Sequence, residues 1–73
     1  MNIKDAHSYL KMLIKKKKEL EKRMEDLNKK KEKKQITEDE YLKEKKKIER
    51  EYIEVMDRLV QMKYITGQHD LFS

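Results

Sequence analysis

The amino-acid sequence predicts an all-α protein in which two long helices fold back on each other as an antiparallel coiled-coil hairpin. Three observations predict this fold. The 73 residues contain no proline and a single glycine, so nothing interrupts a helix between residues 3 and 66. Apolar residues recur at alternating spacings of three and four, which is the seam of a coiled coil. A helix-capping sequence lies near the middle of the chain.

The first helix is expected over about residues 3–34. Asn2 suits its N-cap position, and Asp5 lies near the positive end of the helix dipole. Lys17 occupies the one gap in the apolar seam. The seam consists of Ile3, Ala6, Leu10, Leu13, Leu20, Met24 and Leu27.

The turn is marked by a capping box, in which Thr37 takes the N-cap position and Glu40 the third helical position. Ile36 and Tyr41 flank the box at the two positions of a hydrophobic staple. A new helix is therefore expected to begin at Glu38.

The second helix is expected over about 38–66, with Lys45 in the gap of its seam. Gly67 suits the left-handed position just after a helix, and residues 68–73 follow as a C-terminal peptide. The seam residues are Tyr41, Ile48, Tyr52, Val55, Leu59 and Met62, and a second apolar stripe consists of Ile53, Met56 and Val60.

A turn near residue 35 means that the numbers of two facing residues, one on each helix, add up to about 70.

One alternative fold remains open at the level of sequence. Lys34 and Tyr41 occupy equivalent heptad positions, so the seam runs through the turn unbroken and also fits one long parallel coiled coil. The capping box favours the break.

Association is expected because the chain is short and 48% of its residues are charged, so one core gives little stability. Without cysteine, no disulfide supplements the core. Near the open end of the hairpin the apolar face is wider than one partner helix covers, which predicts a two-fold homodimer in the form of a four-helix bundle. The predicted interface is Leu10, Leu13, Ile14, Tyr52, Ile53, Met56, Leu59 and Val60.

The C-terminal peptide contains the sequence Gln68-His69-Asp70-Leu71-Phe72. It resembles the bacterial sliding-clamp-binding motif, whose usual form is Gln, any residue, Ser or Asp, Leu, Phe. The resemblance implies that Leu71 and Phe72 fill an apolar pocket on the DNA sliding clamp. It also implies that Gln68 hydrogen-bonds at a second subsite and that Asp70 is the spacer.

This resemblance implies a small protein that modulates DNA replication, either as an inhibitor that excludes polymerase from the clamp or as a recruiter. Inhibition would suit a protein encoded by a phage or mobile element. Two other interpretations of the peptide stay open: Leu71 and Phe72 fold back on the bundle, or the match is accidental.

The turn carries a second, weaker resemblance. Residues 34–41, with the lysines that follow, resemble the short C-terminal (SHOCT-like) domain, in which a similar turn joins two small helices. The glycine that precedes the turn in that family is absent here. The resemblance supports the fold and implies no activity.

Other function classes find little support in the sequence. No nucleophile–base pair, paired carboxylate site or phosphate-binding loop is visible, so we expect no enzyme and no cofactor. His7 and His69 lack partners at ligand spacing, so no metal site is expected. No apolar run has the length of a membrane span and no signal peptide is visible, which favours a cytoplasmic location.

Two alternative functions follow from the helices themselves. Lysine runs, notably 15–18, 29–34 and 45–47, suit weak, non-specific and salt-dependent contact with nucleic acid. The second alternative is a purely structural oligomerisation protein.

Overall fold

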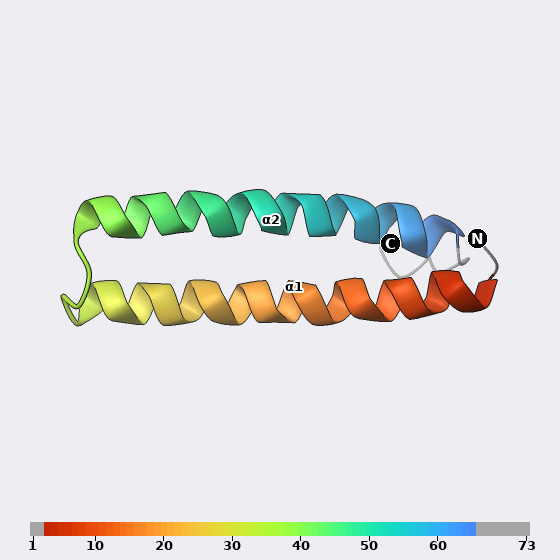
Figure 1. The fold of residues 1–73 in the computed structure, drawn as a ribbon, viewed down its shortest axis with the longest axis horizontal. Helices are drawn as coiled ribbons and strands as arrows, with labels where there is room; N and C mark the ends of the chain where they lie inside the picture. The colour runs from red at the N-terminus through yellow and green to blue at the C-terminus, as the bar shows by residue number, and fades with distance from the viewer. Residues whose placement is uncertain (1–2, 66–73) are drawn as a thin grey trace.

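The computed structural model describes residues 3–65 and contains two helices, α1 (Ile3–Glu32) and α2 (Glu38–Ile65), which run antiparallel (Figure 1). They form a rod 47 Å long, with the turn at one end. The start of α1 and the end of α2 therefore lie together at the other end, which we call the open end. The predicted all-α helical hairpin is confirmed.

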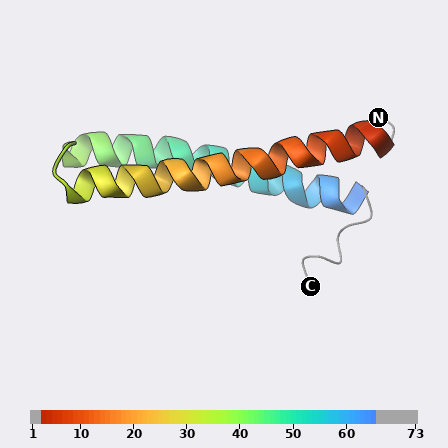
Figure 2. The same ribbon diagram turned by 90° about the horizontal axis from the view of Figure 1, so that it is seen from below.

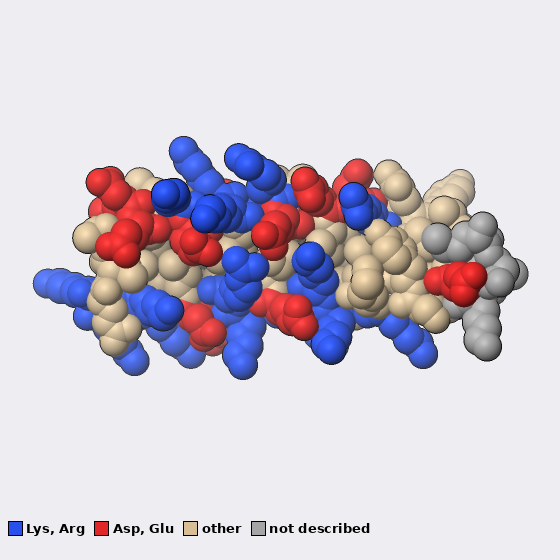
Figure 3. Space-filling model, viewed as in Figure 1, with Lys and Arg blue, Asp and Glu red and all other residues tan. Residues whose placement is uncertain are grey.

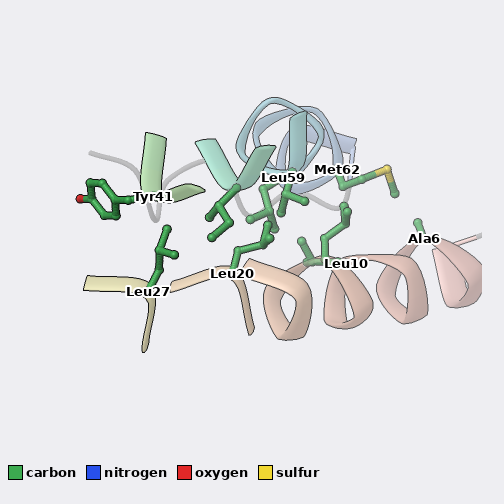
Figure 4. Close-up of a cluster of buried hydrophobic side chains, with 10 residues drawn as sticks. Ala6, Leu10, Leu20, Leu27, Tyr41, Leu59 and Met62 are labelled. Carbon is green, nitrogen blue, oxygen red and sulfur yellow. The ribbon is translucent and has the colours of Figure 1, made fainter. Parts of the chain in front are cut away.

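The core is a single layer of side chains between the two helices. In Figure 4, labelled residues of α1, such as Leu10 and Leu20, point toward α2, and Leu59 of α2 points back. In the part of the chain whose burial the structure describes, every buried residue belongs to one of the two predicted seams, because a heptad spacing keeps one stripe of each helix facing its partner. The buried residues are Ala6, Leu10, Leu13, Leu20, Leu27, Tyr41, Ile48, Val55, Leu59 and Met62.

The helices cross at a shallow angle near the middle of the rod (Figure 2). Hydrogen bonds and ion pairs between the helices show which residues face each other along the rod. In each bonded pair the two residue numbers are added, and the sum ranges from 67, for Tyr9 with Arg58, to 74, for Arg23 with Glu51. This range agrees with the expected value of about 70 for a turn near residue 35.

Helix α1 ends at Glu32, two residues before the expected boundary at 34. Lys34 has a φ of 58°, in the left-handed region. The Gln35 N–H bonds to the Lys30 carbonyl at 2.9 Å and the Lys34 N–H bonds to the Lys31 carbonyl at 3.0 Å. These two bonds form a Schellman motif, with lysine at the position that usually holds glycine.

Helix α2 begins at Glu38, as the capping box predicts. The Glu40 N–H donates to Thr37 Oγ1 at 3.1 Å, and the Thr37 N–H donates to Glu40 Oε1 at 3.4 Å. Half-buried Ile36 and buried Tyr41 join the same apolar cluster. The break over residues 33–37 excludes the single long helix that the unbroken heptad register also allowed.

Charged side chains cover much of the rod from the turn to its middle, and a larger uncharged area lies toward the open end (Figure 3). This distribution agrees with the uneven apolar width expected from the sequence. Neither α1 nor α2 is long and apolar enough to cross a membrane.

Candidate binding surfaces

The predicted clamp-binding residues Gln68, Asp70, Leu71 and Phe72 lie outside the described residues. The motif begins three positions after Ile65, the last residue of α2. The surfaces described below are those of residues 3–65.

The structure divides the predicted dimer interface into two groups. Leu10, Leu13 and Leu59 are buried within a single chain, so they offer almost no surface to a second copy. The reason is that they occupy seam positions, which the other helix of the same chain already covers. The remaining five are half-buried or exposed and surround the seam: Ile14, Tyr52, Ile53, Met56 and Val60.

An apolar groove of about 410 Å³ opens on one side of the rod. Its lining comes from both helices and includes Met24 of α1 with Tyr52 and Ile53 of α2. Helical spacing places Ile14, Met56 and Val60 on the same side, because residues three, four or seven apart share a helix face. We call the set Ile14, Met24, Tyr52, Ile53, Met56 and Val60 the apolar face.

The edges of the apolar face carry charges that are paired within each helix. Lys17 bonds to Glu21 at 3.5 Å on α1, and Lys45 bonds to Glu49 at 3.8 Å on α2. Each pair joins residues four apart, which are neighbours on the helix surface. These four charges are therefore paired within their own helices.

Tyr52 lies at the centre of the apolar face, and its phenol is directed to α1. The hydroxyl donates to Glu21 Oε2 at 3.0 Å. Partial burial raises the pKa of Tyr52 above its usual 10.0, and the hydrogen bond to the Glu21 carboxylate and the charge of that carboxylate raise it further. Lys17 opposes these effects. The ring is thus a neutral apolar surface at physiological pH, with its polar group satisfied within the chain.

The opposite side of the rod, which we call the polar face, is bridged by ion pairs and hydrogen bonds. The Arg23 guanidinium spans two acids of α2, at 3.4 Å from Glu44 and 3.3 Å from Glu51. Nearer the open end, Arg58 donates to the Tyr9 hydroxyl at 3.2 Å. Met12, which is 51% exposed, lies on this side with Tyr9 and Arg58. The two sides of the rod therefore differ in chemistry.

Near the turn, Lys31 of the lysine run 29–34 contacts an aromatic ring and an acidic side chain. The Tyr41 hydroxyl donates to Asn28 Oδ1 at 2.8 Å, and Lys31 Nζ lies 4.2 Å from the centre of the Tyr41 ring. Lys31 also bonds to Glu38 at 3.2 Å. This lysine is held by a cation–π contact and an ion pair, so it contributes less to a basic surface than its sequence position suggests.

The net positive charge is concentrated on one helix. Helix α1 contains eleven Lys and Arg against six Asp and Glu, a net +5, whereas α2 contains seven against eight, a net −1. Lys11, Lys15, Lys18 and Lys22, at spacings of three and four, follow one exposed outer face of α1. The lysine run 15–18 noted in the sequence contains Lys15 and Lys18, and the spacing of three and four adds Lys11 and Lys22 to the same face.

Within residues 3–65, no three His, Cys, Asp or Glu side chains gather where a metal ion could be held. Comparison with protein-family models, with curated proteins and with solved structures gave no significant match. The fold and the surfaces define the class of the molecule, which is a charged helical hairpin with one apolar face.

Proposed function

We propose that this chain is a non-enzymatic, cytoplasmic binding protein whose helical hairpin carries a C-terminal peptide for the bacterial DNA sliding clamp. The observation that carries the proposal is the sequence Gln68-His69-Asp70-Leu71-Phe72, which begins three positions after the end of α2. Binding in the clamp pocket excludes other proteins that use it, and so modulates DNA replication.

The helical rod supports this role. Among residues 3–65, buried side chains from Ala6 to Met62 form one core between α1 and α2. The motif follows in the sequence, three positions after Ile65. A folded hairpin with a binding motif directly after its second helix suits an adaptor or an inhibitor.

The energy available from the peptide fits a modest affinity. Burial of Leu71 and Phe72 in a pocket contributes roughly 3–6 kcal/mol. A micromolar complex requires about 8 kcal/mol. The Gln68 side chain supplies a further polar contact of about 1 kcal/mol, so the motif accounts for most of a micromolar interaction.

The test is titration of the full chain against a purified bacterial sliding clamp by calorimetry. Replacement of both anchors, Leu71→Ala with Phe72→Ala, is expected to abolish binding and leave the helical circular dichroism signal unchanged. Gln68→Ala is expected to weaken binding less. Leu42→Ala, at a 44% exposed leucine near the turn, is the matched control and should bind as the unmodified chain does.

Two outcomes would reject the proposal. If the double variant binds the clamp as well as the unmodified chain, the peptide is not the binding element. If it instead loses thermal stability, Leu71 and Phe72 belong to the folded bundle.

A second candidate function is supported by the charge of α1. Its row of exposed lysines, Lys11, Lys15, Lys18 and Lys22, suits sequence-independent contact with nucleic-acid phosphates. Replacing all four with glutamine should remove binding to a DNA duplex at low salt, and the unmodified chain should lose most of its affinity as salt rises. Clamp binding by the same variant separates the two functions, because the peptide is untouched.

A further inference from the structure

We infer that the apolar face is the contact surface for a second copy of this chain, and that the two hairpins pack as a two-fold dimer with α1 of each beside α2 of the other. This inference concerns the helices and is independent of clamp binding. It rests on the group of exposed and half-buried apolar residues that forms the apolar face and on the distribution of charge between the two helices.

The first step concerns exposure. Ile53 is 68% exposed and Val60 is 49% exposed, and they lie seven residues apart on one side of α2. Half-buried Tyr52 and Met56 fill the space between them and the seam. Branched aliphatic side chains in a row beside an apolar groove mark an interaction surface, because single exposed apolar residues are common but a contiguous set is not.

The second step concerns the polar groups at this surface. The Tyr52 hydroxyl is bonded to Glu21, and Glu21 and Glu49 each bond to a lysine of their own helix. Since these groups already have partners within the chain, a protein that covers the apolar face does not leave them unpaired. A protein surface that is apolar at its centre and internally paired at its edges suits a protein partner.

The third step identifies the partner as a second copy. At the level of the apolar face, residues 11–22 of α1 contain six lysines and two glutamates, a net +4. The facing segment of α2, residues 48–59, contains four acids and two arginines, a net −2. The α1 segment beside the apolar face is therefore positive overall, and the α2 segment beside it is negative overall.

Two-fold symmetry makes use of this difference. Rotation about a two-fold axis that runs along the rod places the acidic α2 of the second copy beside the basic α1 of the first, and the reverse contact follows by symmetry. A partner of uniform charge would match one helix and repel the other. The same rotation places the two apolar faces against each other, which gives a four-helix bundle.

The test is the oligomeric state of the full chain by sedimentation equilibrium at micromolar concentration. The expected mass is near twice 9.0 kDa. Ile53→Lys should raise the dimer dissociation constant by roughly 100-fold or more, because it places an unpaired charge in a surface that loses its water. Met12→Lys makes the same change in charge on the polar face and should leave the dimer intact.

Cross-linking provides a second measurement that does not depend on the stability of a charged variant. The chain has no cysteine, so single cysteines can be introduced without background. With a short bis-maleimide, Ile53→Cys should give covalent dimers and Met12→Cys should not. A monomeric unmodified chain, a dimer unaffected by Ile53→Lys, or cross-linking favoured by Met12→Cys would each overturn the inference.

Discussion

The hydroxyl of Tyr52 on α2 donates a hydrogen bond of 3.0 Å to the Glu21 carboxylate on α1, and thereby joins the two helices beside the groove of the apolar face. The bond requires the phenol to keep its proton. It therefore connects the stability of the hairpin to pH in the alkaline range.

The pKa of Tyr52 is raised above 10.0 in the folded chain by partial burial and by Glu21. Because the folded pKa lies above the unfolded value, the stabilisation is complete below pH 10 and is lost as pH rises through the folded pKa. We expect the free energy of unfolding of the unmodified chain to fall more steeply above pH 10 than that of Tyr52→Phe.

Spectrophotometric titration checks this directly, since the difference between the unmodified chain and Tyr52→Phe isolates one phenol among four tyrosines. The isolated phenol should titrate above 10.0. A midpoint at or below that value, or identical alkaline unfolding of the two chains, would contradict the link.

The capping box predicts a measurable loss of stability at Thr37. Thr37→Ala removes the oxygen that accepts the Glu40 N–H, and should lower the free energy of unfolding by about 0.5–2 kcal/mol. Chemical denaturation followed by circular dichroism measures the change. Thr37→Ser keeps a hydroxyl at the N-cap and serves as the control. Equal losses in both variants would mean that the hydroxyl is not the stabilising group.

The left-handed conformation of Lys34 predicts a stabilising substitution. A side chain at positive φ costs about 1–2 kcal/mol relative to glycine, so Lys34→Gly should raise the free energy of unfolding by about 1 kcal/mol. The same replacement at Lys30, inside α1, should lower it by about 1 kcal/mol. Thermal denaturation of both variants is decisive, because the two changes are chemically identical and their expected effects have opposite signs.

The narrow core predicts a large effect at its most buried side chain. Leu20 is 1% exposed, and Leu20→Ala should cost about 2–5 kcal/mol through lost burial and the cavity left behind. A chain of 73 residues has a total stability of roughly 4–11 kcal/mol. We therefore expect partial or complete loss of the cooperative thermal transition. Leu42→Ala, at an exposed position, should change stability by less than about 1 kcal/mol, and a larger loss there than at Leu20 would show that the core is elsewhere.

The fold was largely predictable because its two strongest signals are local. A heptad spacing identifies the buried stripe of each helix without knowledge of the partner, and the Thr37–Glu40 box marks a helix start from four residues. The end of α1 was not predictable in the same way. Glycine is the usual sequence signal for the left-handed residue that ends a helix. Position 34 adopts this conformation but holds lysine, so the sequence contains no such signal there.

The candidate surfaces were predictable only in part, because side-chain exposure depends on register across the hairpin. The heptad pattern places Leu59 in the seam and Val60 in the second apolar stripe. How much of that second stripe α1 covers depends on the pairing of the helices, which leaves Val60 half exposed. The Arg23 bridge to Glu44 and Glu51 depends on the same register and has no signal in the sequence.

The register of the hairpin also sets the order in which it forms. Bonds between the helices join residues 7 apart near the turn, as in Lys31 with Glu38, and 49 apart near the open end, as in Tyr9 with Arg58. Closing a loop of 49 residues directly costs more chain entropy than closing a loop of 7. If the contacts nearer the turn have already formed, each next contact closes only a short additional loop. Folding should therefore spread from the turn, and amide hydrogen exchange should be fastest at the open end. A partner bound at the open end would contact the part of the hairpin that unfolds locally most often. Its binding would therefore slow amide hydrogen exchange in the first turns of α1.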